Sequence, residues 1–155
     1  MPQMNKGGKF IFGQSLIRED GTVLFPSLAV KEYDIAAEGK VYLFTGSKIT
    51  GGFCVTRKGL LLPSKLGHIL EETPELLNYL PEPGEFIKYK GRFYCYADIS
   101  KDGKIVLTKD MMSFLKLEAG MKLLSIRSSD VAFTMGAKGP LLEKAENYDG
   151  EIPLF

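Results

Sequence analysis

The sequence predicts a mainly β protein in which one structural unit occurs twice, with short helices between the strands. The chain from Asp20 reads DGTVLFPSLAVKEYDIAAEGKVYLFTGS, and from Asp102 it reads DGKIVLTKDMMSFLKLEAGMKLLSIRSS, so the two segments align without a gap at an offset of 82 residues. After a slip of two residues the match resumes between FCVTRKGLL from Phe53 and FTMGAKGPL from Phe133. Both copies consist of short apolar runs separated by glycine-containing turns, which is typical of strands. Such similarity indicates one supersecondary unit used twice.

The apolar register supports the repeat more strongly than the sparse identities do. Residues 23–25 (VLF) align with 105–107 (IVL), and residues 41–44 (VYLF) align with 123–126 (LLSI). The preceding segment also matches, with a gap of one residue, between GKFIFGQSLIREDG from Gly8 and GRFYCYADISKDG from Gly91. Two unrelated β-rich segments with ordinary patterning are the alternative. The shared order of glycines and apolar runs favours the repeat.

The elements of each copy follow from this pattern. In the first copy, residues 8–61, we predict strands at 23–25, 41–45 and 53–56 and a helical turn near 28–33. In the second copy, residues 91–141, we predict strands at 93–99 and 104–107, joined by a turn at Asp102-Gly103. A short helix at 110–115 follows, with Asp110 as its N-cap, and then a hairpin of 123–126 and 131–135.

Helices are predicted in the connector, residues 62–90, between the two copies. Ser64 is expected to cap a helix that runs to Leu70, and Thr73 to cap a second helix that begins at Pro74 and ends near Leu80. A strand at 85–90 would form a hairpin with the second copy. The tail comprises residues 142–155. A turn of helix is expected at 141–146, and the pattern leaves open whether the last residues of the tail dock.

The composition is that of a globular domain, with 155 residues, 45% hydrophobic and 25% charged. No segment approaches the roughly 20 apolar residues of a membrane span, and the N-terminal MPQMNKGGK lacks a signal-peptide core. We therefore expect a cytoplasmic protein without membrane partners. Cys54 and Cys95 lie in apolar runs and are expected to be buried free thiols, since no redox motif accompanies them.

The net charge of +1 is unevenly distributed along the chain. Residues 1–61 and 91–138 each carry eight basic and five acidic side chains. The intervening residues 62–90 carry three basic and five acidic side chains, and residues 139–155 carry one and four. This asymmetry predicts a mildly basic face shared by the two copies, well short of a strongly basic nucleic-acid binder.

No catalytic constellation is evident in the sequence. His68 is the only histidine and is expected to be a solvent-facing or partly buried residue of a helix, and Asp98 and Asp102 are explained by the turn they flank. The glycines at 51–52 indicate a hairpin turn rather than a phosphate loop, because no Lys-Ser/Thr pair follows. The aromatic run at 93–96 is interpreted as core, with base stacking on an exposed sheet as the alternative. We therefore predict a protein that is not an enzyme and binds no cofactor or metal.

The second copy resembles the AbrB/MazE/SpoVT family of bacterial and archaeal transition-state regulators and antitoxins. The positions that carry the resemblance are Asp102, Gly103, Lys104, Ile105, Leu107, Thr108, Lys109, Met111, Met112, Leu115, Leu117, Gly120, Met121 and Leu123. The resemblance implies a swapped-hairpin (AbrB-like) β-barrel, in which two copies exchange hairpins. In that family the copies usually come from two chains, whereas here one chain would supply both. The connector and the tail lie outside the resemblance.

The resemblance also implies a set of DNA-contacting positions. Lys104 and Lys109 stand at basic positions of the family pattern, while Met112 replaces its usual arginine. In the first copy, Thr22 and Val30 occupy the corresponding basic positions. The side chains expected to contact DNA are Lys101, Lys104, Lys109, Arg18 and Lys31. A lysine-rich set favours contacts to the phosphate backbone over reading of base edges.

The leading functional hypothesis from the sequence is a DNA-binding transcription regulator that binds double-stranded DNA and cooperates as a homo-oligomer. The alternative is a non-catalytic protein- or ligand-binding module on the same barrel, in which DNA binding has been lost.

Overall fold

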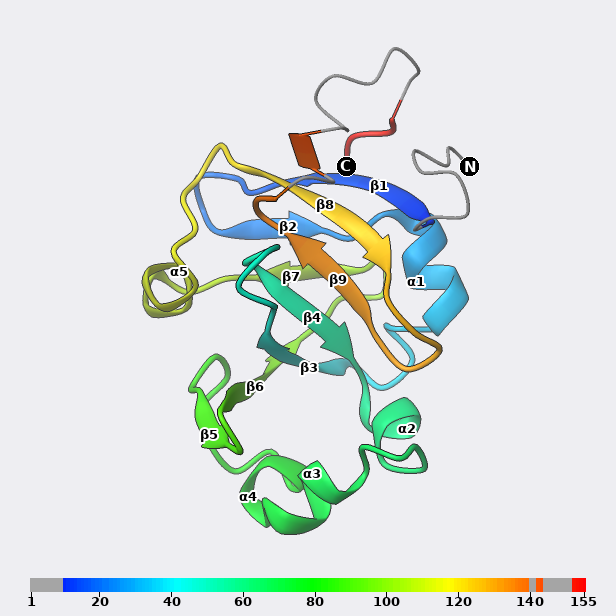
Figure 1. Cartoon of the computed structure of the whole chain (residues 1–155), viewed down its shortest axis with the longest axis vertical. Helices are drawn as coiled ribbons and strands as arrows, with labels where there is room; N and C mark the ends of the chain where they lie inside the picture. Colours follow the sequence, from blue (N-terminus) through cyan, green and yellow to red (C-terminus); the bar gives the residue numbers. More distant parts are fainter. Residues whose placement is uncertain (1–9, 140–141, 144–151) are drawn as a thin grey trace.

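The computed structural model describes residues 10–139, 142–143 and 152–155 and confirms a mainly β protein (Figure 1). Seven strands form one antiparallel sheet, in the spatial order β1 (Ile11–Leu16), β8 (Lys122–Arg127), β9 (Phe133–Gly136), β4 (Phe53–Thr56), β3 (Lys40–Thr45), β6 (Arg92–Asp98) and β5 (Ile87–Tyr89). Two further strands, β2 (Thr22–Leu24) and β7 (Lys104–Val106), form a separate antiparallel ribbon. Strands β1, β2, β3 and β4 come from the first predicted copy, and β6, β7, β8 and β9 from the second.

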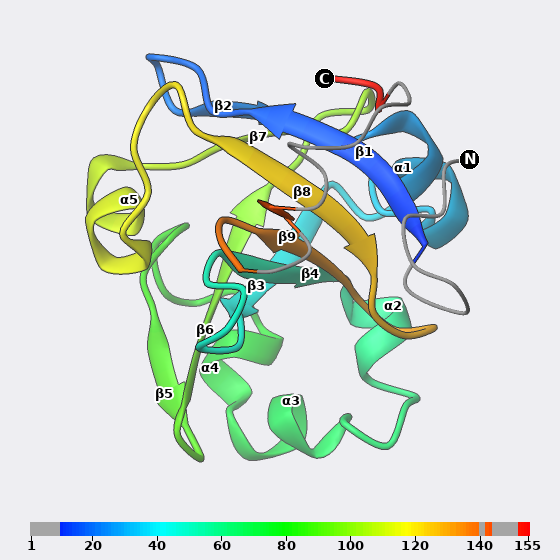
Figure 2. The same ribbon diagram turned by 45° about the horizontal axis from the view of Figure 1, so that its top comes forward.

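Within the described residues, five short helices link the strands. They are α1 (Ser27–Tyr33), α2 (Lys58–Leu61), α3 (His68–Glu72), α4 (Pro74–Leu77) and α5 (Lys109–Leu115). Helices α1 and α5 follow the two ribbon strands, whereas α2, α3 and α4 lie between β4 and β5 along the chain. Figure 2 shows this second group of helices gathered below the sheet, away from β2 and β7.

Each face of the sheet covers its own apolar core. On the first face, strand residues such as Phe133 pack against the ribbon, α1 and α5 in one large cluster. Phe25 contributes to it a ring whose centroid lies 5.3 Å from that of Phe133, in an edge-on contact. On the second face, Tyr42 and Tyr96 pack against Leu61 and Leu70 of the connecting helices. Burial of each large side chain contributes about 1.5–3 kcal/mol, so both layers stabilise the sheet.

The strand registers relate the two halves of the chain. In the ribbon, Val23 lies opposite Ile105, and in the sheet Cys54 lies opposite Thr134. In both pairs, the partners are residues that the sequence alignment places at corresponding positions. The β1·β8 and β3·β6 ladders correspond in the same way, with Leu16 opposite Lys122 and Lys40 opposite Asp98.

A β-bulge accounts for the one-residue gap in the sequence alignment. The β1·β8 register shifts between Ile11 and Gly13, so Phe12 has no partner opposite it in the ladder. The corresponding strand β6 pairs with β3 without interruption. The extra residue of the first copy is therefore absorbed by the bulge, which leaves the rest of the strand in register.

The expectation of a closed barrel is wrong. β1 and β5 are the two outer strands of the sheet and do not pair with each other in the described part of the chain. The outer edge of β6 is occupied by β5, and the outer edge of β1 by the last residues of the chain. The edges that would meet in a barrel are thus covered by other segments, which also protects them from edge-to-edge association.

The tail docks on β1 as a short parallel segment. Gln14 N donates to Pro153 O at 2.8 Å, Phe155 N donates to Gln14 O at 2.7 Å, and Leu16 N donates to Phe155 O at 2.9 Å. Gly13 permits this approach, because a Cβ at that position would lie 2.9 Å from both Pro153 O and the Phe155 ring. Most of the helical turn expected at 141–146 lies outside the described residues.

The expected helix caps are wrong in two places. Helix α5 is capped by Thr108, whose Oγ1 accepts from Met111 N at 3.1 Å, and Asp110 lies within its first turn. Helix α3 begins at His68 and is not capped by Ser64, whose Oγ accepts from Leu66 N in a preceding turn. Thr73 is the N-cap residue of α4 and Pro74 its first residue, as predicted, but the Thr73 hydroxyl donates to Ile69 O and makes no side-chain cap, and α4 ends at Leu77.

Candidate ligand-binding cavity

A cavity of about 640 Å³ opens on the second face of the sheet. Its floor is one row of side chains across five neighbouring strands. Ile126 of β8 lies opposite Thr134 of β9, and Thr134 lies opposite Cys54 of β4. Cys54 in turn lies opposite Phe44 of β3, which lies opposite Tyr94 of β6. Because directly opposed residues point to the same face of a sheet, all five side chains line the cavity.

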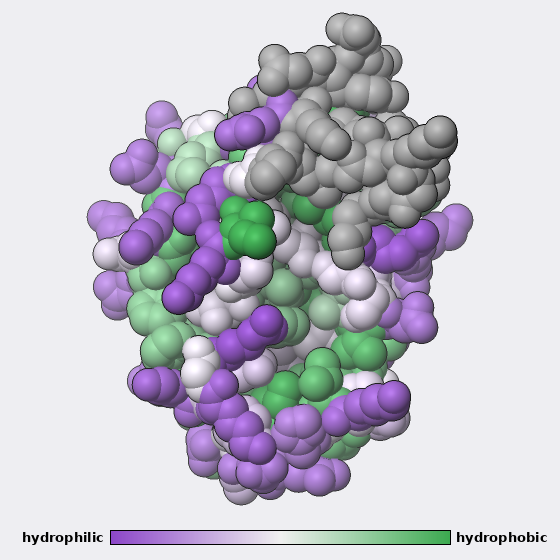
Figure 3. All heavy atoms as spheres, in the orientation of Figure 1, coloured by the Kyte–Doolittle hydropathy of each residue, from purple (hydrophilic) through white to green (hydrophobic). Residues whose placement is uncertain are grey.

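Apolar side chains of the connecting helices form a wall of the cavity. Leu61 of α2 and Ile69 of α3 are buried in the same cluster as Phe44 and Tyr94. The rings of Phe44 and Tyr94 stack with their centroids 5.5 Å apart and their planes 30° apart. In the space-filling view, pale and apolar surfaces surround a central hollow that is ringed by hydrophilic residues (Figure 3). These contacts hold an apolar surface in place before any ligand arrives.

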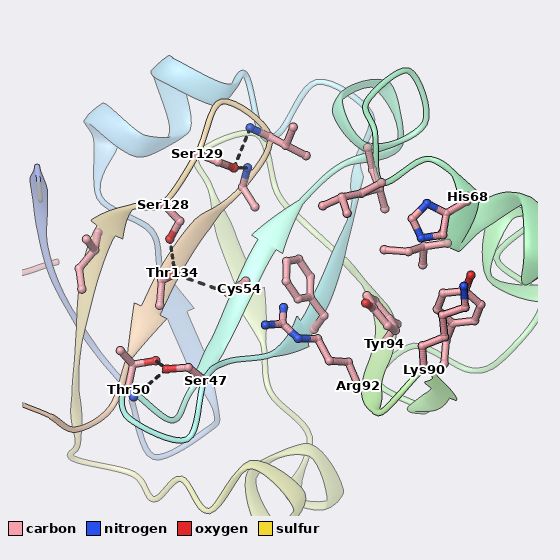
Figure 4. A pocket seen from close by; sticks show the side chains of 18 residues that line it. Ser47, Thr50, Cys54, His68, Lys90, Arg92, Tyr94, Ser128, Ser129 and Thr134 are labelled. Atoms are coloured by element: carbon pink, nitrogen blue, oxygen red, sulfur yellow. Dashed lines mark hydrogen bonds between the residues drawn. The ribbon is translucent and has the colours of Figure 1, made fainter.

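Hydroxyl groups gather at one end of the cavity (Figure 4). Ser128 Oγ is hydrogen-bonded to Thr134 Oγ1, which lies 3.5 Å from Cys54 Sγ. The β3–β4 loop contributes a second pair, with Ser47 Oγ 3.1 Å from Thr50 Oγ1. A hydroxyl both donates and accepts, so this end of the cavity can bind a polar group of either kind.

Cys54 is the most reactive type of side chain in the floor, but its surroundings suppress that reactivity. Burial raises the pKa of the Cys54 thiol, against smaller opposing effects of the Thr134 hydrogen bond and the Arg92 charge. The thiolate is the nucleophilic form of cysteine. Cys54 therefore stays protonated near neutral pH and acts as a small apolar surface. Both cysteines are free, as predicted, with Cys95 buried and Cys54 half-buried.

Basic side chains reach the cavity from β6, its turn and α3. Figure 4 shows Arg92 lying between Tyr94 and Cys54, with its guanidinium directed toward Cys54. The guanidinium carbon is 5.8 Å from the centroid of the Phe44 ring. Lys90 and His68 also line the cavity, and none of the described residues that line it is acidic. An excess of positive charge over an apolar floor is the main electrostatic feature of the site.

No group of three His, Cys, Asp or Glu side chains in residues 10–139, 142–143 and 152–155 is arranged to hold a metal ion. His68 Nδ1 lies 3.1 Å from Lys65 O, so this nitrogen contacts the backbone of the turn that precedes α3. Within the same described ranges, no helix is long and apolar enough to cross a membrane.

The five side chains expected to contact DNA are exposed but are spread over the ribbon and α1. Phe25 N donates to Gly103 O, which places the turn carrying Lys101 beside the start of α1. Leu107 N donates to Gly21 O, which places the turn carrying Arg18 near the start of α5 and Lys109. The two turns therefore lie at opposite ends of the antiparallel ribbon.

Of the remaining two expected DNA contacts, Lys104 adjoins the turn that carries Lys101, and Lys31 lies apart from both turns. Lys104 is on β7, opposite Leu24, and so lies within the ribbon itself. Lys31 is on α1 and lines a small surface hollow with Phe10 and Phe12. The structure brings Arg18 and Lys109 to one end of the ribbon and Lys101 and Lys104 toward the other, with Lys31 separate from both.

Sequence reasoning missed the cavity and its basic side chains. The one available signal was the continuous apolar run 41–44, because a strand that is apolar at successive positions is covered on both faces. The sequence does not indicate which strands flank Arg92, so it did not place this side chain at a cavity. His68 was expected as a solvent-facing or partly buried helix residue and is half-buried in α3, but its place at the cavity wall was not foreseen.

A scan against protein-family models finds no match, and a search of the curated proteins finds none either.

Proposed function

We propose that this protein is a non-catalytic binding module whose cavity holds a small organic molecule. The observation that carries the proposal is the preformed row from Ile126 to Tyr94, which faces the connecting helices across about 640 Å³. Small-molecule sites are typically concave, between about 300 and 1,000 Å³, and mostly apolar with a few placed polar groups. The cavity has this size and this mixture of side chains.

We also propose that the module is a single-chain version of the swapped-hairpin unit. The pairing of corresponding residues supports this, since Val23 meets Ile105 in the ribbon and Cys54 meets Thr134 in the sheet. A twofold relation between the copies requires such self-pairing at its axis. On this view the cavity floor straddles the axis, with the corresponding residues Phe44 and Ile126 on either side.

The binding proposal is tested by recording ¹H–¹⁵N spectra while small aromatic acids, amines and alcohols are added. We expect shifts that cluster at the five floor residues and at Ile69. Cys54→Phe places a ring in the middle of the floor and should abolish these shifts. Val106→Phe is the matched control, because Val106 is 55% exposed on the ribbon and lies outside the cavity. Absence of binding at millimolar concentration, or shifts that Cys54→Phe leaves unchanged, would contradict the proposal.

Double-stranded DNA binding is a second candidate, and one observation favours it. The five expected contacts are exposed, and none forms an ion pair with another described residue, so their charge is available: Arg18, Lys31, Lys101, Lys104 and Lys109. Roughly four to six phosphate contacts would give binding that weakens steeply with salt, by about −0.9 in log–log slope per contact. Cooperation between copies of the chain would strengthen it.

Fluorescence anisotropy with a random duplex at 50 and 200 mM salt tests this candidate. The Lys104→Ala, Lys109→Ala double variant should weaken binding and reduce the salt slope by about 2. Lys65→Ala, Lys88→Ala removes the same charge from the connector and β5 and serves as the control. No salt-sensitive binding at tens of micromolar protein would exclude the DNA role.

A further inference from the structure

We propose that the cavity ligand is a small organic anion with a flat apolar body, and that Arg92 anchors its acidic group. This inference rests on the proposed function, namely that the cavity binds a small molecule. It adds the chemical class of the ligand and the residue that selects it.

The positive charge of the cavity lining favours an anionic ligand. Arg92 and Lys90 are positively charged and line the cavity, and its described lining residues include no carboxylate to balance them. Two arginines outside the cavity are neutralised by carboxylates. Arg57 is paired with Glu38, and Arg127 is paired with Glu32. Arg92 has no acidic partner among the described residues, so its guanidinium is available to an anion that enters the cavity.

The position of Arg92 beside the aromatic floor favours a ligand whose acidic group is attached to an apolar body. Arg92 and Tyr94 are two residues apart on β6 and therefore point to the same face of the sheet. Tyr94 stacks on Phe44, and the Arg92 guanidinium lies over that same Phe44 ring. An acidic group that forms paired hydrogen bonds with Arg92 would thus carry its apolar body onto Phe44 and the neighbouring Cys54.

The length of the row limits the size of the ligand, and the side chains at its far end limit which substituents can bind there. Strands lie about 4.8 Å apart, so the floor from Tyr94 to Ile126 is about 19 Å long, enough for two or three rings in line. Ser128 and Thr134 stand at the far end and can hydrogen-bond a polar substituent there. The half-buried thiol of Cys54, with its raised pKa, adds no negative charge between the two ends.

Two dyes that differ in charge provide the test. The anionic probe is 8-anilinonaphthalene-1-sulfonate, and the neutral probe is N-phenyl-1-naphthylamine, which has the same ring system without the sulfonate. We expect fluorescence titration to show that Arg92→Gln weakens the anionic probe at least tenfold and the neutral probe less than twofold. Arg18→Gln, the charge-matched control outside the cavity, should change neither dissociation constant by more than twofold.

The filled variant Cys54→Phe locates both probes. It should abolish binding of both, and Ser128→Trp, at an exposed residue of the rim, replaces it if Cys54→Phe does not fold. If Arg92→Gln weakens both probes equally or neither, while the filled variant abolishes both, the anion inference is overturned and the cavity remains a binding site. If neither filled variant affects the probes, they bind elsewhere, and both the inference and the proposed function fail.

Discussion

Cys54 and Thr134 lie directly opposite each other in the β4·β9 ladder, with Sγ and Oγ1 3.5 Å apart. They come from the two halves of the chain and occupy corresponding positions in the sequence alignment. Their side chains are neighbours in the cavity floor, with Cys54 at its centre and Thr134 on the side of Ile126. The line along which the two halves meet is therefore also where the chain leaves space for a ligand.

The N-cap of α5 gives the first prediction. Thr108→Ala should lower the free energy of unfolding by about 1 kcal/mol, because Met111 N loses the hydroxyl oxygen that accepts its hydrogen bond. Asp110→Ala is the control and should cost only about a few tenths of a kcal/mol, through the loss of an acid from the first turn. Urea titration of both variants checks this. A larger cost for Asp110→Ala would mean that the sequence-based cap assignment was right.

Two buried serines, of which only one has a hydrogen-bond partner among the described residues, give the second prediction. Ser15 and Ser125 are both fully buried, and Ser15 Oγ donates to Leu24 O at 2.6 Å. Ser125 Oγ has no hydrogen-bond partner among the described residues. Ser15→Ala should therefore lower the free energy of unfolding by about 1 kcal/mol, whereas Ser125→Ala should raise it by up to about 1 kcal/mol. Thermal unfolding measures both, and equal destabilisation by the two changes would contradict the assignment.

The docking of the tail on β1 gives the third prediction. Gly13 has a φ of 149°, and a Cβ there would meet Pro153 O and the Phe155 ring. Gly13→Ala should cost about 1–3 kcal/mol and release residues 152–155, which carboxypeptidase digestion would then remove faster. Gly39→Ala is the control, because Gly39 has a φ of 71° but a Cβ added there would meet no atom within 4 Å. It should add backbone strain without changing the digestion rate, and equal rates for both variants would disprove the docking.

The buried thiol of Cys95 gives the fourth prediction, which concerns pH. Burial raises the pKa of Cys95 to about 12, whereas an unfolded cysteine has a pKa of about 8.5. Between these values the unfolded state has lost the proton that the folded state keeps, so stability falls as pH rises. Below pH 8.5 both states are protonated, and the full stability is present. By pH 10 the loss from this group is about 2 kcal/mol.

A comparison with Cys95→Ala isolates this effect from the tyrosines that titrate in the same range. The variant should be less stable at pH 8, because it loses buried volume, but this disadvantage should shrink by about 2 kcal/mol at pH 10. Urea titrations under reducing conditions at the two pH values measure the difference. A gap that stays constant would show that the Cys95 thiol titrates alike in the folded and unfolded states.

Local patterns in the sequence were sufficient to predict most elements of the sheet. The alternation of apolar runs with glycine turns placed β3, β4, β6 and β8 close to their observed bounds. Cap assignments failed because several residues near a helix start can accept the first hydrogen bonds. At α5 the choice of Thr108 over Asp110 depends on backbone geometry, which composition does not specify. The closed barrel was mispredicted, since the separation of β1 from β5 and the docking of the tail depend on contacts far apart in the chain. The hairpin of β5 with β6 is local and was predicted.

The sequence by itself determined that the chain is mainly β, that its halves share one order of apolar and glycine positions, and that its cysteines are free. The first two properties depend on the periodicity of apolar residues within each strand, and the third follows from the lack of a redox motif beside either cysteine. Only the tertiary structure decided that Phe44, Cys54 and Thr134 share one row and that the connector folds over them. A cavity is a relation between side chains of many strands, and it exists only once their registers and the covering helices are in place.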